Sequence, residues 1–179
     1  MNDQLGLRPV GEDDLALVHR LRSDPSATGE FGWFGWLAPG EVRRGWAEDG
    51  LLGDDGGMLV IVNGAESVGV VNWHKQKTAG VSYCWEIGIA LAPEARGQGY
   101  GTQAHRLLSA YLFAHTLVNR IQAITEIGNV AEQRALEKAG FSREGVLRGL
   151  AFRSGRWVDG VLYSLLRAEV DLGGTGRSV

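Results

Sequence analysis

Cysteine is almost absent from this sequence, which has a single one, Cys84, among its 179 residues. One cysteine excludes an internal disulfide and any zinc site that needs several thiolates. Long apolar runs are absent as well, since none reaches the roughly 18 residues that a membrane-spanning helix requires. The opening residues Met1-Asn2-Asp3 do not begin a signal peptide. We therefore expect a cytoplasmic protein that has no contact with a membrane.

An excess of positive charge is missing too. The formal net charge is −3 at pH 7, which gives no electrostatic reason to expect a nucleic-acid partner. Three of the four histidines, His19, His105 and His115, lie in helix-like segments without other metal-ligating residues around them. We therefore expect no bound metal.

The length and composition favour one soluble globular domain. Hydrophobic residues make up 44% of the chain and charged residues 22%, which is typical of a protein with a sizeable core. We expect this single domain to cover residues 1–170. Residues 171–179 are expected to be disordered, because the tail has no core-forming segment from Gly173 onward.

The spacing of apolar residues predicts a mixed α/β domain. Strands are expected at Leu5–Arg8, Met58–Asn63, Ser67–Trp73, Val81–Leu91, Arg120–Glu126, Phe141–Phe152 and Arg156–Arg167, and helices at Gly11–Ser23, Pro39–Asp49, Gly99–Leu117 and Asn129–Ala139. In Val81–Leu91 the odd positions are large and apolar, whereas the even positions are mostly small and include Cys84 and Glu86. The small residues leave room for a ligand close to this strand.

A glycine-rich loop, Arg96-Gly97-Gln98-Gly99-Tyr100-Gly101, follows that strand and precedes a long helix. Exposed amides at the start of a helix bind anions, so this loop predicts a phosphorylated ligand. It is not a P-loop, because no lysine follows the last glycine, and it lacks the spacing and position of a dinucleotide fingerprint. The alternative is a glycine turn that only caps the helix.

The loop and its surroundings resemble the GCN5-related N-acetyltransferase (GNAT) family. The loop fits that family's [Gln/Arg]-x-x-Gly-x-[Gly/Ala] pattern, and the run WEIGIALAPEARGQGYGT from Trp85 to Thr102 is similar to the branch of ribosomal-protein N-terminal alanine acetyltransferases (RimJ/RimL-like). Further similarities lie at Leu7-Arg8-Pro9, Asp14, Asp24-Pro25, Asn129 to Phe141, Glu144-Gly145, Arg148, Gly155 to Asp159 and Tyr163 to Leu166. The resemblance implies a mostly antiparallel central sheet of about seven strands, flanked by helices and splayed between its two central strands.

The resemblance also implies acetyl-CoA as the acyl donor. The residues expected to bind it are Ile89, Leu91, Arg96, Gly97, Gln98, Gly99, Tyr100, Gly101, Thr102 and Asn129. In this arrangement the loop backbone binds the pyrophosphate, and the backbone at Ile89 and Leu91 pairs with the pantetheine arm. The small-residue side of the preceding strand agrees with such an arm.

Attack of an amine on a thioester requires a neutral amine and a donor for the oxyanion. Glu86 is our candidate base; the alternative is that it only forms an ion pair or hydrogen bond. The backbone N–H of Ile89 is the candidate oxyanion donor. Asn129 is expected to cap its helix, with Glu132 in a capping-box position, and by resemblance to contact the cofactor near its thiol.

The usual general acids of the family are missing. The positions where relatives have Ser or Tyr are Glu132 and Leu136. Tyr163 or a water can take this role, or no acid is needed, because a thiol of pKa about 8.5 can leave as a thiolate. Cys84 is interpreted as a small packing residue, with an acyl-cysteine intermediate as the disfavoured alternative.

The acceptor side is expected to be aromatic. Its candidate residues are Trp33, Phe34, Trp36, Trp73, His74 and Glu86. Core packing is the alternative for each tryptophan, and a surface position is the alternative for His74. The segment Phe31–Leu37 is also a candidate subunit contact, so both a monomer and a homodimer remain open.

These observations predict an enzyme that transfers an acetyl group from acetyl-CoA to a primary amine of a protein N-terminus or a small molecule. Two alternatives remain. One is the same fold with another donor such as succinyl-CoA, which would require a cation near the thioester. The other is a CoA-binding sensor or interaction module with little catalysis, which the missing acids at Glu132 and Leu136 keep open.

Overall fold

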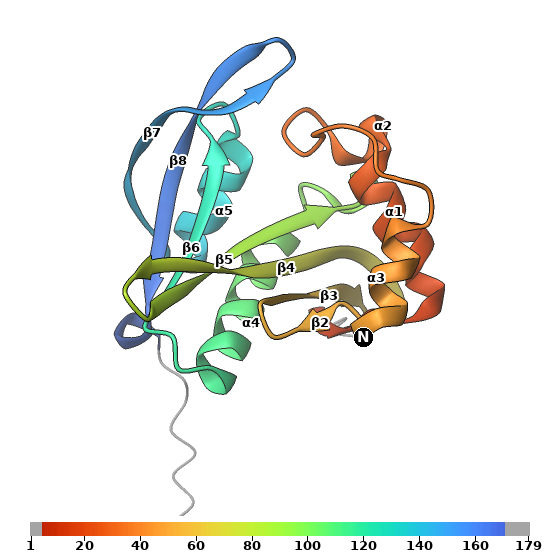
Figure 1. Cartoon of the computed structure of the whole chain (residues 1–179), viewed down its shortest axis with the longest axis horizontal. Helices are drawn as coiled ribbons and strands as arrows, with labels where there is room; N and C mark the ends of the chain where they lie inside the picture. The colour runs from red at the N-terminus through yellow and green to blue at the C-terminus, as the bar shows by residue number, and fades with distance from the viewer. Residues whose placement is uncertain (1–4, 171–179) are drawn as a thin grey trace, which may run out of the picture.

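An open and mostly antiparallel sheet runs through the protein, whose computed structural model describes residues 5–170 (Figure 1). The strand order is β1-β3-β4-β5-β6-β8-β7, and a short strand, β2, pairs with β3. The strands are β1 (Leu5–Pro9), β2 (Leu52–Gly53), β3 (Gly56–Asn63), β4 (Glu66–Ala79), β5 (Ser82–Leu91), β6 (Arg120–Glu126), β7 (Ser142–Arg153) and β8 (Arg156–Leu166). This is the sheet that the sequence predicts, with β2 added.

Helices cover both faces of the sheet. They are α1 (Leu15–Ser23), α2 (Pro25–Thr28), α3 (Glu41–Asp49), α4 (Tyr100–His115) and α5 (Val130–Ala139), with short 3-10 turns at Glu12–Asp14, Pro93–Ala95 and Arg167–Glu169. The α1–α3 side has its own apolar cluster, in which Val18 and Leu21 meet Val60 and Val70. Behind the sheet, α4 and α5 pack on the main core (Figure 1). Within residues 5–170, every helix is too short or too polar to traverse a lipid bilayer.

The start of α1 is fixed by a buried carboxylate. A helix was expected from Gly11, but residues Glu12–Asp14 form a 3-10 turn and α1 begins at Leu15. Asp14 is 4% exposed and accepts hydrogen bonds from Arg8 (2.5 and 2.9 Å), the Gly11 amide (2.8 Å) and Ser67 (2.9 Å). These donors, Arg8 above all, lower the pKa of Asp14 to about 2. Asp14 thus ties three separate segments together.

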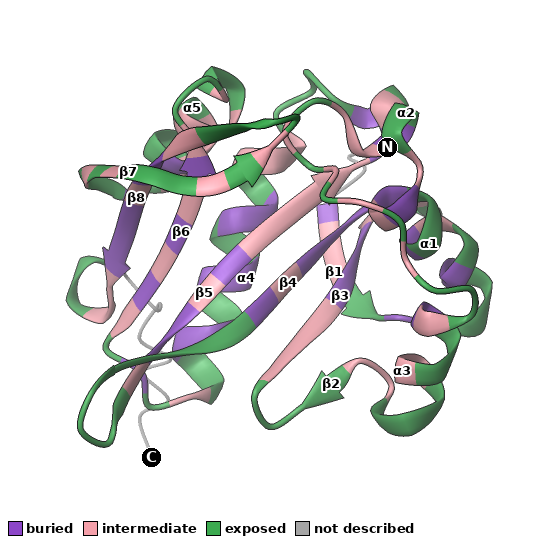
Figure 2. Ribbon diagram, turned by 45° about the horizontal axis from the view of Figure 1, so that its top comes forward, coloured by how far each residue is buried: buried purple, intermediate pink, exposed green. Residues whose placement is uncertain are grey.

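The sheet separates between β5 and β6, its only parallel pair in the described part of the chain. The two strands pair at Trp85 with Ile121 and at Glu86 with Gln122, and at no later residue. Beyond that point β5 continues along β4 to Leu91, while β6 continues along β8 to Glu126. The expected splay is therefore confirmed, and it opens directly after Glu86. Figure 2 shows β5 changing from buried at its centre to intermediate exposure toward Leu91.

Some local expectations were wrong. β4 runs on to Ala79 rather than ending at Trp73, as a polar and exposed ribbon whose side chains give no apolar alternation. Val81 is 99% exposed because it belongs to the turn before β5, next to Gly80 at φ +56°, and not to the buried face of the strand. The helix α2 was not anticipated. The expected disorder of residues 171–179 lies outside the described residues.

Candidate active site

The glycine-rich loop leads into the first turn of α4, as predicted. Gly97 and Gly99 have φ values of +76° and +81°, a left-handed conformation that favours glycine, and a Cβ at either position would meet open space. Gly99 caps α4 without a side-chain hydrogen bond to the helix start. The first turn of a 16-residue helix thus faces an open surface, which suits an anion.

Arg96 braces the end of β5. Its Nε donates to the carbonyl of Leu91 (3.1 Å), and its Nη2 donates to the carbonyl of Ala27 on α2. Two residues expected to bind the cofactor, Arg96 and Leu91, are therefore bonded to each other here. The brace also connects the glycine loop with α2.

Glu86 lies at the last paired position before the splay. Its Oε2 accepts a hydrogen bond from Gln122 Nε2 (2.7 Å), and its Oε1 lies 3.5 Å from His74 Nε2. The carboxylate side chain keeps 21% of its surface exposed. Strand register explains the cluster, because His74 pairs with Glu86 and Glu86 pairs with Gln122. His74 and Glu86 were both predicted; Gln122 was missed, because only the β5–β6 register reveals it.

Asn129 caps α5, which confirms the capping interpretation. Its Oδ1 accepts from the amide of Glu132 (3.3 Å), and its Nδ2 donates to Thr125 on β6 (3.0 Å). The expected capping box does not form, because the Glu132 carboxylate instead bonds Nε2 of the fully buried His105 (2.7 Å). Asn129 therefore ties the start of α5 to the β6 wall of the splay.

Tyr163 is a poor match for a general acid. Its side chain is fully buried, and its hydroxyl donates to Glu137 on α5 (3.0 Å). Burial and this carboxylate raise the pKa of Tyr163. Leu136 is fully buried as well.

A family model described as "Acetyltransferase (GNAT) domain" matches residues 4–142. The chain belongs to the GNAT family. A curated relative, "Putative ribosomal N-acetyltransferase YdaF" of Bacillus subtilis (strain 168), is 37% identical over 84 residues, which are 47% of this chain. The match spans about half the length of that relative, 46%.

Two solved GNAT structures share the fold of this chain. Spermidine N-acetyltransferase from Vibrio cholerae, solved with CoA and spermine, has a TM-score of 0.79 at 22% identity and covers 94% of this chain and 98% of its own. RimJ from Mycobacterium smegmatis, solved with CoA-disulfide, has a TM-score of 0.74 at 24% identity and covers 93% and 83%. The name of the curated relative agrees with the resemblance to the ribosomal branch of the GNAT family, and RimJ shares the fold.

The aromatic residues expected on the acceptor side do not all meet in this GNAT domain. Trp73 is 8% exposed and packs on Tyr111 of α4, because it alternates with His74 and so lies on the opposite face from Glu86. Phe34 and Trp36 are 72% and 78% exposed. Trp33 packs edge-on against Trp36 and borders a cavity next to the β7–β8 turn.

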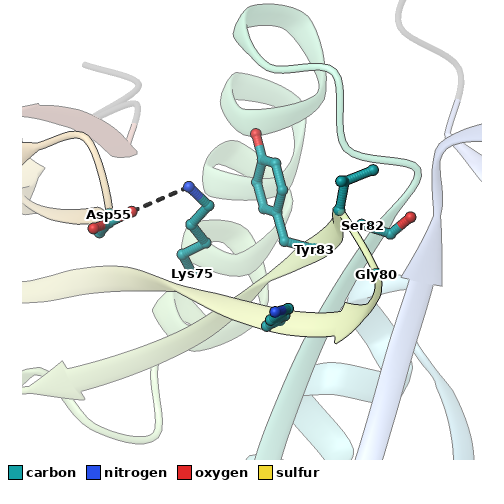
Figure 3. Close-up of a pocket in the computed structure, with 7 residues that line it drawn as sticks. Asp55, Lys75, Gly80, Ser82 and Tyr83 are labelled. Carbon is teal, nitrogen blue, oxygen red and sulfur yellow. Dashed lines mark hydrogen bonds and ion pairs between the residues drawn. The ribbon is translucent and has the colours of Figure 1, made fainter.

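A larger surface cavity, of about 440 Å³, lies at the β4–β5 turn (Figure 3). Lys75 bonds Asp55 there (3.1 Å) and covers the Tyr83 ring at 4.8 Å. This turn is at the opposite end of β5 from the glycine loop. The cavity is therefore not part of the site around Glu86. Within residues 5–170, no group of three or more metal-ligating side chains occurs.

Cys84 allows a direct test of the acyl-cysteine alternative. The thiol is buried, and burial raises its pKa, which disfavours the nucleophilic thiolate. We expect Cys84→Ala to keep kcat within about twofold of wild type and the wild-type thiol to resist alkylation. A steady-state assay and mass spectrometry after iodoacetamide treatment would check this. Loss of turnover in a folded Cys84→Ala protein would restore the covalent route.

Proposed function

We propose that this GNAT protein transfers the acetyl group of acetyl-CoA to a primary amine by direct attack on the thioester. The observation that supports this most is the separation of β5 from β6 immediately after Glu86. The opening has a carboxylate at its closed end and an anion-binding helix start beyond the end of β5. A linear thioester with a phosphorylated tail fits that sequence of features.

In this proposal acetyl-CoA is a substrate, and the chain supplies its binding groups. The amides from Gln98 to Thr102 receive the pyrophosphate, and the free edge of β5 around Ile89 lies beside the pantetheine. The left-handed glycines Gly97 and Gly99, with open space around them, suit a loop that wraps a phosphate.

Glu86 accepts the proton that the amine must lose. Gln122 on β6 donates to one of its oxygens, and His74 on β4 lies 3.5 Å from the other, so both neighbouring strands contribute to its position. The Ile89 amide donates to the oxyanion, and Asn129 lies near the departing sulfur. No side-chain acid is required, because a thiol of pKa about 8.5 can leave as a thiolate. The chain therefore acts by orienting two substrates and removing a proton.

The acceptor is a protein N-terminus or a small-molecule amine. The names of the relatives point to ribosomal and polyamine acceptors for those proteins. We place the protein in the cytoplasm, as a monomer or homodimer that works without nucleic acid or a membrane.

The test is release of CoA. The protein is incubated with acetyl-CoA, a panel of amines and a thiol reagent that reports free CoA. Release that depends on an amine supports the proposal. Measurable acetyl-CoA binding with no release for any amine would instead favour a CoA-binding sensor.

The loop assignment makes its own prediction. Gly99→Val forces a β-branched residue into a left-handed conformation at the phosphate site, and we expect about a tenfold loss of CoA affinity. Gly50→Val is the matched control, because Gly50 has φ +68° and equally open surroundings but caps α3. Calorimetric titration with CoA would measure both. Equal affinity in the two variants would contradict the assignment.

A further inference from the structure

A second cavity, of about 300 Å³, lies between the segment after α2 and the tip of the β7–β8 hairpin. Pro25, Gly29, Glu30 and Trp33 line one side, and Arg153, Ser154, Arg156 and Val158 line the other. The loop after α2 and the hairpin tip lie across from each other at the top of Figure 1. Nothing so far assigns this cavity a ligand.

The cavity adjoins the wall of the splay that β6 forms. Arg153 Nη2 donates to Glu126 Oε2 (2.5 Å) at the end of β6. Glu126 shares a face of β6 with Gln122, the partner of Glu86, and lies about 13 Å farther along the strand. Phe31 packs beside this pair, under the Arg153 guanidinium (5.3 Å) and next to Gly128. The cavity and the closed end of the splay thus lie along one strand, β6, about four residues apart.

Buried polar atoms without a hydrogen-bond partner concentrate around this cavity. Among the described residues five such side-chain atoms occur, and three of them are Trp33 Nε1, Glu126 Oε1 and Arg153 Nε. Native proteins satisfy most buried polar groups, so a cluster of exceptions needs an explanation. Two of these atoms donate and one accepts. A group with oxygen acceptors next to an N–H donor would satisfy all three.

The charges around the cavity are balanced rather than acidic. Arg153 and Arg156 line it together with Glu30, and Glu126 pairs with Arg153. No ion pair involves Arg156 within residues 5–170, so this guanidinium is available to a ligand. A polycation would meet two arginines here. A carboxylate would meet a guanidinium that can hold it with two hydrogen bonds.

We propose that this cavity binds the C-terminal carboxylate of a short peptide acceptor. About four extended residues span the roughly 13 Å along β6, whereas the amine of a free amino acid lies too close to its carboxylate to reach Glu86. The inference rests on the proposed acetyl transfer. Arg156 and Trp33 hold the carboxylate, Arg153 completes the donor set, and Glu126 accepts from a neighbouring N–H. The amine of the same molecule then points along β6 toward Glu86. A carboxylate on the acyl donor, as in succinyl-CoA, has the same chemistry and is a separate arm of the test.

The first experiment compares tetrapeptides with their C-terminal amides as acceptors for acetyl-CoA. Amidation removes the carboxylate and leaves the N-terminal amine nearly unchanged, because the two ends of the peptide are far apart. We expect the acids to show the higher kcat/KM, by about tenfold. Spermidine is included as a polycationic acceptor, which the two arginines should disfavour. Succinyl-CoA with an amidated acceptor tests whether the cavity binds the carboxylate of the acyl donor instead.

The second experiment assigns the preference to the cavity. Arg156→Gln should raise KM for the acids about tenfold and leave the amides unchanged, because only the acids use the guanidinium. Arg148→Gln removes an exposed arginine of the same hairpin that does not line the cavity, and both acceptor classes should be unaffected. Arg156 is exposed, so its loss should not unfold the protein.

Each outcome decides the inference. If acids and amides have equal kcat/KM, or if Arg156→Gln changes KM for neither class of acceptor, the inference is overturned. Carboxylate dependence only with succinyl-CoA keeps the subsite but assigns it to the acyl donor, which overturns the acceptor class. If no amine releases CoA, the proposed function fails separately. Calorimetric titration of the tetrapeptide acids into the CoA-bound protein then decides, since binding lost in Arg156→Gln supports the subsite and no binding overturns it.

Discussion

Glu86→Gln is expected to lower kcat by about a hundredfold at neutral pH, because the amide cannot accept the amine proton. The substitution preserves the shape of the side chain, and Gln122 can still bond the remaining oxygen. Substrate binding should change little, so CoA affinity should match wild type. A steady-state assay with the best amine acceptor, combined with CoA titration, would measure both quantities.

The control for Glu86 is Glu66→Gln, an exposed carboxylate at the start of β4. It should leave kcat unchanged. The dependence of kcat on pH separates a base from a structural carboxylate, because only loss of a base changes the shape of the profile. A Glu86→Gln profile that has the wild-type shape and a near-normal rate would reject the role and leave Glu86 as a hydrogen-bond partner of Gln122.

Asp14→Ala is expected to be the most destabilising of the substitutions considered, lowering the free energy of unfolding by about 2–3 kcal/mol at pH 7. The aspartate is buried and receives hydrogen bonds from Arg8, Gly11 and Ser67. Without it the Gly11 amide and the Ser67 hydroxyl lose their acceptor, and Arg8 keeps its hydrogen bonds to the Pro9 carbonyl and Ser67. Urea unfolding followed by circular dichroism would measure the loss. Asp13→Ala, at the exposed neighbouring position, should cost under about 0.5 kcal/mol.

The same aspartate predicts a pH dependence with a definite sign. Arg8 and the other donors lower the pKa of Asp14 from 3.8 to about 2 in the folded protein. The stabilisation is therefore complete above about pH 4 and fades as the pH falls toward 2. The difference in stability between wild type and Asp14→Ala should shrink over that range. A difference that stays constant from pH 7 to pH 2 would contradict the ion pair as its source.

Local chemistry made much of the fold predictable. The strand Arg120–Glu126 has the predicted bounds, because its apolar residues alternate cleanly and are buried on one side. The turn at Ser154 and Gly155 has φ values of +51° and +80°, as a tight hairpin requires. The extension of β4 to Ala79 could not be predicted in this way. Its exposed residues are held by pairing with β5, which is a tertiary contact rather than a local preference.

The site was predictable where one strand carries the information. Alternation along β5 separated Glu86 from the core, and the glycines marked the start of α4. Trp73 and His74 are adjacent residues of β4, so alternation alone would have placed them on opposite faces of the sheet. The cluster of Glu126, Arg153 and Trp33 was not predictable, because it joins three segments that only the folded chain brings together.

The two-residue pairing of β5 with β6 has a mechanical consequence. It divides the sheet into two half-sheets, with α4 packed on β1, β4 and β5 and α5 packed on β7. Three hydrogen bonds link the helices: Thr102 to Ala135, His105 to Glu132, and Arg106 to Lys138. The buried His105–Glu132 bond thus lies at the joint between the halves. The two helices therefore bridge the halves of the sheet behind an opening whose walls pair directly at only two positions.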